Sequence, residues 1–295
     1  MPRLLARFAA ILCVALLLAS CGGGSSSNSN NISLYLADAP IDQASSVVVS
    51  FTEIDVTGDQ GTFPFPFPQS TPINIYQLQG GLSQFLFQGT LPAGHYTSIT
   101  LYFDALPGTL DSYVTLVGNG NSYPLVIPAG QPTKITVPVN FIVFQNLTAS
   151  YTLDLDLRKS VLPDPSDPNQ YILQPSLRAV SNNAYGMITG TVANKLVSSG
   201  CAGAVYVYPG KVTPTDVNIN APAGSVQPIS SALIGVNNTT GQFAFTVGFL
   251  PAGDYTVAFT CQANLDNPTT SDNIQFPSTT TTSVKAGSTA FITLN

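Results

Sequence analysis

The sequence predicts an all-β protein made of two tandem antiparallel β-sandwiches, and three observations support this prediction. Residues 91–97 (LPAGHYT) return almost unchanged as residues 250–256 (LPAGDYT), so the chain has two related halves. There are 24 glycines and 23 prolines, which separate short runs of β-branched or alternating residues, as in strands joined by turns. Only 8% of the residues are charged, so Ser, Thr, Asn and Gln must solvate the sheets.

The repeated stretch predicts the same folding element in both halves, a tyrosine corner. Proline presets one turn dihedral and glycine supplies a positive φ. The ring of Tyr96 or Tyr255 then lies on the core while its hydroxyl bonds back to the turn. His95 occupies the position that Asp254 fills in the second copy. We therefore expect His95 to be an exposed turn residue and not a catalytic base.

The amino terminus predicts export and lipid anchoring. Arg3 and Arg7 precede an apolar run over residues 8–18, which is typical of a signal peptide and too short to span a bilayer. The run ends in LASC at residues 18–21, which resembles the lipobox of bacterial lipoproteins. We expect residues 1–20 to be cleaved, Cys21 to carry acyl chains, and residues 21–31, rich in Gly, Ser and Asn, to form a tether. Gly22 then favours the outer membrane, on its periplasmic or surface face, if the cell is Gram-negative.

The cysteines indicate an oxidising compartment. With Cys13 in the signal and Cys21 lipidated, Cys201 and Cys261 remain, both in the second half. In an exported protein this favours a disulfide between them. Two separate buried thiols are the alternative.

The net charge of −6, with 15 acidic and 9 basic residues, argues against nucleic acid as a partner, because no basic stripe exists to neutralise phosphates. No His-x-x-x-His spacing and no glycine run before a helix occurs, so we expect no metal and no cofactor.

The first domain is expected over residues 32–181. Runs at residues 32–36, 47–56, 98–103, 113–117, 123–127 and 133–140 predict strands. Between them, Phe63, Phe65 and Phe67 alternate with prolines, which we expect to prevent ladder pairing and to give an extended loop. The three rings either fold back as a lid on the sandwich edge or face water as a binding loop.

The acidic residues of this domain raise the question of a metal or catalytic site. Residues 151–160 read as one strand that places Asp154, Asp156 and Arg158 on the same face. Arg158 would then neutralise one carboxylate. A second acidic segment, with Asp164, Asp167 and Asn169, lacks the glycine and the terminal acid of an EF-hand loop. Whether either set binds an ion stays open, although a structural role is preferred for both.

The second domain is expected over residues 182–295. Its runs at residues 186–192, 204–208, 241–247 and 284–294 predict strands. A Pro- and Asn-rich insert at residues 209–228 is expected to decorate one end of the sandwich and is a second candidate binding patch.

Two family resemblances follow from these residues. The order of the blocks at residues 34–40 (LYLADAP), 73–81, 91–99, 154–160 (DLDLRKS) and 171–175 resembles a domain of unknown function in bacterial envelope lipoproteins. This resemblance implies an exported β-sandwich without an established activity. The second half looks like the transthyretin-like, carboxypeptidase-regulatory sandwich, of the broad immunoglobulin/transthyretin-like type, which implies a spacer, folding aid or binding module.

We therefore expect a non-enzymatic, lipid-anchored envelope protein that binds the membrane through its lipid and presents loops to glycan, peptide or a partner protein. The alternative is an envelope glycan hydrolase or accessory subunit with paired carboxylates, for which Asp104, Asp111, Asp154 and Asp156 would have to converge on a cleft.

Overall fold

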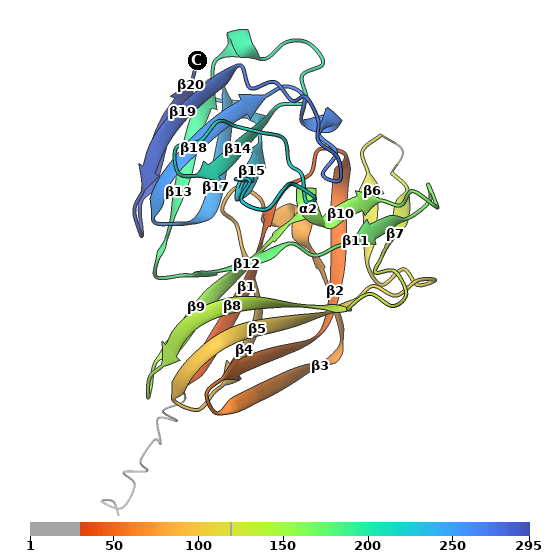
Figure 1. Cartoon of the computed structure of the whole chain (residues 1–295), viewed down its shortest axis with the longest axis vertical. Coiled ribbons are helices and arrows are strands. Elements are labelled where there is room, and N and C mark those ends of the chain that lie inside the picture. The colour runs from red at the N-terminus through yellow and green to blue at the C-terminus, as the bar shows by residue number, and fades with distance from the viewer. Residues whose placement is uncertain (1–29, 119) are drawn as a thin grey trace, which may run out of the picture.

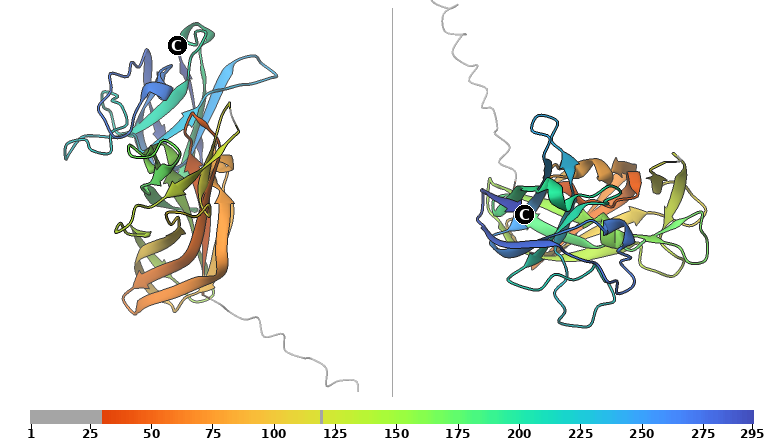
Figure 2. Two further views of the ribbon diagram at one scale, coloured as in Figure 1. Left: turned by 90° about the vertical axis from the view of Figure 1, so that its right-hand side faces the viewer. Right: turned by 90° about the horizontal axis from the view of Figure 1, so that it is seen from above.

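The computed structural model describes residues 30–118 and 120–295, and it confirms the all-β prediction. Four sheets form two sandwiches, which Figure 1 shows one above the other, with the C-terminus at the end opposite to the start of the described chain. Seen from the side, the molecule is elongated along the line of the two sandwiches (Figure 2, left). The signal peptide, the lipidation site Cys21 and all but the end of the tether lie outside the described residues.

Two sheets make the first sandwich. The smaller sheet has the order β12 (Leu177–Ser181), β9 (Thr148–Asp156), β1 (Asn31–Ala39) and β4 (Gln84–Thr90). The larger sheet has the order β10 (Val161–Pro163), β11 (Tyr171–Leu173), β7 (Ser122–Val126), β6 (Tyr113–Leu116), β2 (Ala44–Gly58), β5 (Gly94–Asp104) and β8 (Lys134–Val143), with β3 (Gly61–Asn74) paired to β2. A 3₁₀ turn, η1 (Ile75–Leu78), follows β3.

The long strand β2 organises this sandwich, because its apolar residues point into the core along its whole length. Val47, Val49 and Phe51 are fully buried, and so are Ile54 and Val56. The change from odd to even positions occurs at a register shift between Phe51 and Glu53, which appears in the pairing with both β3 and β5. A bulge of this kind adds one residue and so keeps the apolar side chains on one face.

The proline-rich segment is a strand, so our expectation of a loop was wrong. Among the described residues β3 is hydrogen-bonded to β2 alone, which makes it an edge strand. Pro64 and Pro66 pair with Asp55 and Glu53 of β2, and both occupy even positions. Because alternate residues of an edge strand turn their N–H groups away from the only neighbour, prolines of one parity remove no ladder bond.

Both tyrosine corners are confirmed. The Tyr96 hydroxyl donates to the Pro92 carbonyl at 2.8 Å, and the Tyr255 hydroxyl donates to the Pro251 carbonyl at 2.7 Å. Both rings are buried, and Tyr96 stacks on Phe141 with 5.4 Å between ring centroids. The repeat in the sequence is therefore a repeated structural element.

The segment expected as one strand over residues 151–160 changes conformation after Asp156. Strand β9 ends there and α2 (Leu157–Ser160) makes a single helical turn, capped by the Asp156 carboxylate, which accepts from the Lys159 amide. Arg158 therefore does not share a strand face with Asp154 and Asp156. The helical turn directs Arg158 toward the second sandwich instead.

The second sandwich also has two sheets. One has the order β16 (Gly235–Val236), β17 (Phe243–Pro251), β13 (Tyr185–Val192) and β20 (Thr289–Leu294). The other has the order β15 (Ser230–Leu233), β14 (Ala204–Pro209), β18 (Gly253–Thr260) and β19 (Ser278–Val284). Two 3₁₀ turns, η2 (Asn194–Leu196) and η3 (Ala263–Leu265), lie in the connections.

The insert at residues 209–228 covers a sheet face as well as extending a loop. Strand β14 is buried on both sides: Val205 and Val207 face the sandwich core, while Tyr206 and Tyr208 pack with Val217 of the insert. The Tyr208 hydroxyl donates to the Thr215 carbonyl inside the insert. The unbroken apolar run of β14 is explained by this second layer.

The two sandwiches meet through close backbone contacts. A Cβ added to Gly248 of β17 would lie 2.5 Å from the Cα of Gly81, so only glycine permits this approach. The next residue, Phe249, has a φ of +53°, which is unusual for an aromatic residue. Its buried ring packs with Ala37 and Val180 of the first sandwich.

The predicted disulfide is present between Cys201 and Cys261, which are 60 residues apart. In the chain-entropy account, closing a loop of this length stabilises the folded state by about 4 kcal/mol. We expect the double variant Cys201→Ala, Cys261→Ala to lose about this much free energy of unfolding in urea denaturation.

The variant Cys21→Ala is the matched control, because it removes a cysteine without touching the pair. An unchanged urea midpoint in the double variant, or two free thiols in the denatured, unreduced protein, would contradict the prediction.

Candidate functional site

The acidic pair on β9 is used for structure. Asp154 forms an ion pair with Arg178 of β12, and Arg178 also donates to the Phe249 carbonyl of the second sandwich. Asp156 pairs with Lys159 at 2.7 Å. Each carboxylate therefore pairs with its own cation. From the sequence we expected Arg158 to be one of these partners, and it is not.

A third acid, Asp38 of β1, lies with this pair. It is buried, and neither of its carboxylate oxygens has a hydrogen-bond partner among the described residues. Burial raises its pKa well above the usual range, and the charges of Asp154 and Asp156 add to the effect. The nearby Leu157 amide and the Arg158 guanidinium oppose the shift only in part. Burial also raises the pKa of Asp154.

The four acids of the hydrolase alternative lie on three separate segments of the chain. Asp104 ends β5 and Asp111 follows it in a loop, whereas Asp154 and Asp156 lie on β9. The backbone carbonyls of Asp104 and Asp111 accept hydrogen bonds from Ser112 and Ser50. None of the four lines any of the five main pockets of the described structure.

The connector at residues 164–169 satisfies its own carboxylates. Asp164 accepts from the Ser166 amide and hydroxyl and from the Gln170 side chain, and these bonds lower its pKa. Asp167 accepts from the Asn169 amide. The segment thus forms successive Asx turns.

Sequence reasoning missed a group of three acids in the second domain. Oxygens of Asp216, Asp266 and Asp272 lie within 4.8 Å of one another. They are bonded to protein groups: Asp266 accepts from the Tyr206 hydroxyl and the Val217 amide, and Asp216 accepts from the Asp272 amide. Because 50 residues of chain separate the first acid from the second, no local sequence signal pointed to this group.

Arg158 forms the polar centre of the junction between the sandwiches. Its Nη1 donates to Asp42 of the first sandwich at 2.9 Å and to the Ala263 carbonyl of the second at 3.1 Å. Its guanidinium lies 5.2 Å from the ring centroid of Tyr206, within cation–π range. Burial alone would lower its pKa, but Tyr206, Asp42 and Asp266 outweigh burial and raise it, so the group is charged.

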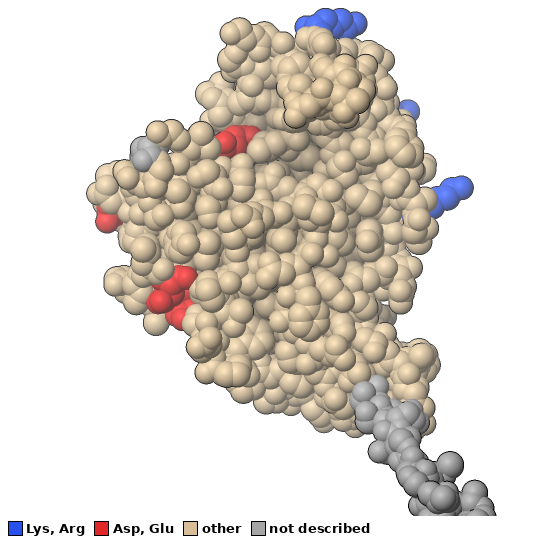
Figure 3. All heavy atoms as spheres, turned by 180° about the vertical axis from the view of Figure 1, so that it is seen from behind, with Lys and Arg blue, Asp and Glu red and all other residues tan. Residues whose placement is uncertain are grey.

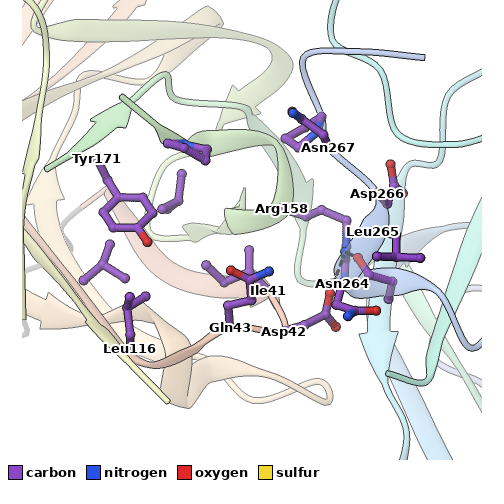
Figure 4. A pocket seen from close by; sticks show the side chains of 15 residues that line it. Ile41, Asp42, Gln43, Leu116, Arg158, Tyr171, Asn264, Leu265, Asp266 and Asn267 are labelled. Carbon is purple, nitrogen blue, oxygen red and sulfur yellow. Dashed lines mark hydrogen bonds and ion pairs between the residues drawn. The ribbon is translucent and has the colours of Figure 1, made fainter. Parts of the chain in front are cut away.

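A pocket of about 270 Å³ opens beside this arginine, and we call it the interdomain pocket. The first sandwich contributes Gln43, Leu116 and Tyr171, and residues 263–268 contribute the opposite wall. Figure 4 shows Tyr171 and Leu116 across the hollow from Asn264, Leu265 and Asn267, with Arg158 and Asp42 between them. Two larger hollows, of about 480 and 590 Å³, are more open and have no acidic lining residue within the described chain.

The aromatic segment packs on the first sandwich. Phe65 and Phe67 lie 4.7 and 6.3 Å from Phe87, and Phe63 lies 6.0 Å from Tyr96, between ring centroids. All three rings are half-buried against the core. This is the lid position weighed from the sequence; a role of the rings in binding stays a prediction.

His95 lies at the end of the first sandwich that carries the start of the described chain. Its ring nitrogens contact Asn140 at 2.9 Å and Asp59 at 3.4 Å, and these contacts raise its pKa. His95 is half-buried in β5, where it pairs with Ile142 of β8, so our expectation of an exposed turn residue was wrong.

Comparisons with known proteins give a family for the first half. Residues 29–175 match the family described as Domain of unknown function (DUF4382). No curated protein matches the chain. The domain of unknown function expected from the sequence is thereby identified.

The chain is similar to several solved structures. These include the Bacillus anthracis TIE protein, with 11% identity over 90% of this chain and 34% of that chain (TM-score 0.21). GBS52, the minor pilin of Streptococcus agalactiae, has 12% identity over 88% and 93% (TM-score 0.19). The fimbrial anchor protein Mfa2 of Porphyromonas gingivalis has 10% identity over 80% of each chain (TM-score 0.17). The chain spans about a third of the length of the first of these proteins. The TM-scores are too low for the likeness to carry an argument.

Removing one ring of the lid is expected to destabilise the first sandwich. Phe65→Ser exposes Phe87 and should cost about 2 kcal/mol, less than for a fully buried phenylalanine because Phe65 is half-exposed. Phe144→Ser, at an exposed position, should change the free energy of unfolding by less than about 0.5 kcal/mol. Equal melting temperatures for the two variants would show that Phe65 is not part of the core.

Asp38 is expected to make stability depend on pH. The carboxyl of Asp38 holds its proton more tightly in the folded state than in the unfolded chain, where aspartates have a pKa of about 4. The free energy of unfolding should therefore fall as pH rises from about 4 through the raised folded pKa. Asp38→Asn imitates the protonated form and should be more stable than wild type at neutral pH, with a flatter pH profile. Asp111→Asn, at an exposed acid, should keep the wild-type profile, and a wild-type profile in Asp38→Asn would refute the assignment.

Proposed function

Given that residues 29–175 form a DUF4382 domain, we propose that the chain is a non-enzymatic, lipid-anchored binding module of the bacterial cell envelope. Its ligand site is the interdomain pocket. The observation that carries this proposal is the placement of polar side chains from both sandwiches around one hollow whose centre is held by a buried ion pair, Arg158 with Asp42. A site built in this way is fixed before the ligand arrives, which lowers the entropic cost of binding.

The lining favours a neutral polar ligand. Gln43 and Asn264 each offer both donor and acceptor atoms, whereas Asn267, whose Oδ1 accepts from the Thr269 amide and hydroxyl, offers its side-chain N–H groups. Ile41 and Leu116 supply apolar contact, and Tyr171 adds a ring with a polar end. The volume lies just below the range of about 300–1,000 Å³ that is usual for drug-sized ligands. The site therefore suits a short segment of a glycan or a peptide.

The ion pair and hydrogen bonds made by the acids of the pocket support a binding role in preference to hydrolysis. Asp42 and Asp266 both line the pocket, but Asp42 pairs with Arg158, and Asp266 accepts from Tyr206 and Val217. A glycosidase needs one carboxyl free to donate a proton and a second free to act as base or nucleophile. Neither acid is free for such a role in this arrangement.

Anchoring at Cys21 is the second part of the proposal, and the motif LASC at residues 18–21 supports it. Within the described residues, no helix is long and apolar enough to cross a bilayer. A lipid would hold the two sandwiches at the membrane while leaving the pocket open to the envelope.

The test is binding to a panel of soluble muropeptides and envelope oligosaccharides, measured by surface plasmon resonance with the full chain. Gln43→Ala and Asn264→Ala remove one exposed amide from each sandwich and should each weaken binding about threefold to tenfold, as expected for one hydrogen bond. Asn183→Ala, at an exposed turn outside the pocket, is the matched control and should bind like wild type.

Binding that is unaffected by Gln43→Ala and Asn264→Ala would move the site elsewhere. The hydrolase alternative makes a different prediction: new reducing ends would accumulate with wild type and disappear with Asp42→Asn. Mass spectrometry of protein extracted from membranes tests the anchor separately, and an unmodified Cys21 would refute it.

A further inference from the structure

An apolar patch lies at the end of the first sandwich where the described chain begins. Ile142, Phe144 and Leu147 are 53%, 57% and 59% exposed, and we call them the tip patch. Ile142 and Phe144 flank buried Val143 and so point outward from the end of β8. Leu147 lies in the following turn, where its amide bonds to the Phe144 carbonyl at 3.4 Å. Apolar residues that are scattered singly over a surface need no explanation, but three within six residues indicate a contact site.

Hydrogen bonds fix the tip patch to the start of the described chain. The Asn146 amide donates to the Asn30 side chain at 2.9 Å, and the Asn31 amide donates to the Leu147 carbonyl at 3.2 Å. The Leu91 amide donates to the Asn30 carbonyl at 3.0 Å. Figure 1 shows that the C-terminus lies at the other end of the molecule. The segment that leads back to Cys21 therefore leaves beside the patch.

The length of this segment limits how far the patch can lie from a lipid on Cys21. Nine peptide units join Cys21 to Asn30, and at about 3.3–3.6 Å per residue they span at most about 30 Å. An anchor at Cys21 thus keeps the tip of the first sandwich near the bilayer surface.

The tip has little charge that would resist contact with lipid. Residues 135–153, which include all of the tip patch, contain no Lys, Arg, Asp or Glu. In the view of Figure 3, the surface next to the start of the described chain shows no Lys, Arg, Asp or Glu. At the same end, the Asp59 carboxylate contacts the His95 ring at 3.4 Å, and a protonated His95 would counter its charge. Apolar side chains can therefore enter the interfacial region without the desolvation of an ion.

We propose that the tip patch inserts into the interfacial region of the lipid bilayer beside the acyl chains on Cys21. This inference rests on the proposed anchor, and it adds a second contact that orients the protein. With the tip in the membrane, the long axis points away from the bilayer, and the second sandwich lies farthest from it. A single acyl anchor leaves orientation free, whereas an anchor together with a protein contact restricts it.

The test uses the absence of tryptophan from the chain. Phe144→Trp introduces one fluorophore in the tip patch, and Phe291→Trp introduces one at a residue of β20 that is 80% exposed. Each full-length variant is expressed with its own amino terminus, purified in detergent, and reconstituted into vesicles of phosphatidylethanolamine and phosphatidylglycerol with brominated acyl chains. The indole of the Phe144→Trp variant should shift its emission to the blue and lose at least half its intensity. The indole of the Phe291→Trp variant should keep both its wavelength and its intensity.

Each other result contradicts the inference in a distinguishable way. If mass spectrometry finds lipid on Cys21 and the Phe144→Trp variant is quenched no more than the Phe291→Trp variant, the tip patch does not enter the bilayer, although the anchor stands. A blue shift without bromine quenching, retained in detergent, means that a second copy of the chain covers the patch. An unmodified Cys21 refutes the anchor and this inference together. Ile142→Trp repeats the measurement if Phe144→Trp disturbs the near-ultraviolet circular dichroism of the sandwich.

Discussion

The arrangement of the two sandwiches depends on one buried charge, that of Arg158. A guanidinium removed from water is costly unless it is paired and bonded, and its partners come from both sides: Asp42 from the first sandwich, and Ala263 and Tyr206 from the second. Separating the sandwiches would take the Ala263 carbonyl and the Tyr206 ring away from this charge and would uncover Tyr206. The charge therefore specifies one docking geometry, which apolar contacts alone would define less sharply.

Backbone features at the same junction act in the same direction. Because Gly81 and Gly248 have no side chains, the two backbone segments approach more closely than any Cβ atom would permit. Phe249 takes a left-handed conformation that costs on the order of 1 kcal/mol or more. That cost is offset where its ring packs on Ala37 and Val180 and its carbonyl accepts from Arg178. The strained backbone of Phe249 is thus stabilised by its contacts with the other sandwich. These contacts hold the two sandwiches in one arrangement, and so they fix the walls of the pocket beside Arg158.

Local patterns in the sequence predicted the fold class, most strands and both tyrosine corners, because these depend on residues close in the chain. The same reasoning failed at residues 157–160, where the strand period continues but the Asp156 side chain caps a helical turn instead. It failed again at β3, where alternate prolines are harmless only because β2 is the sole neighbour. The interdomain pocket brings Gln43 and Tyr171 to residues 263–268, and no local pattern encodes contacts between segments so far apart in the sequence.

The proline-bearing edge of β3 has a consequence for the chain's neighbours. An exposed strand edge normally offers a row of N–H groups to which another extended chain can add. At Pro64 and Pro66 the outward position carries a ring in place of a hydrogen. This part of the edge therefore offers fewer N–H groups to a foreign strand. We therefore expect that another protein would not add a strand beside β3, and that assembly by strand addition would use another edge of the first sandwich.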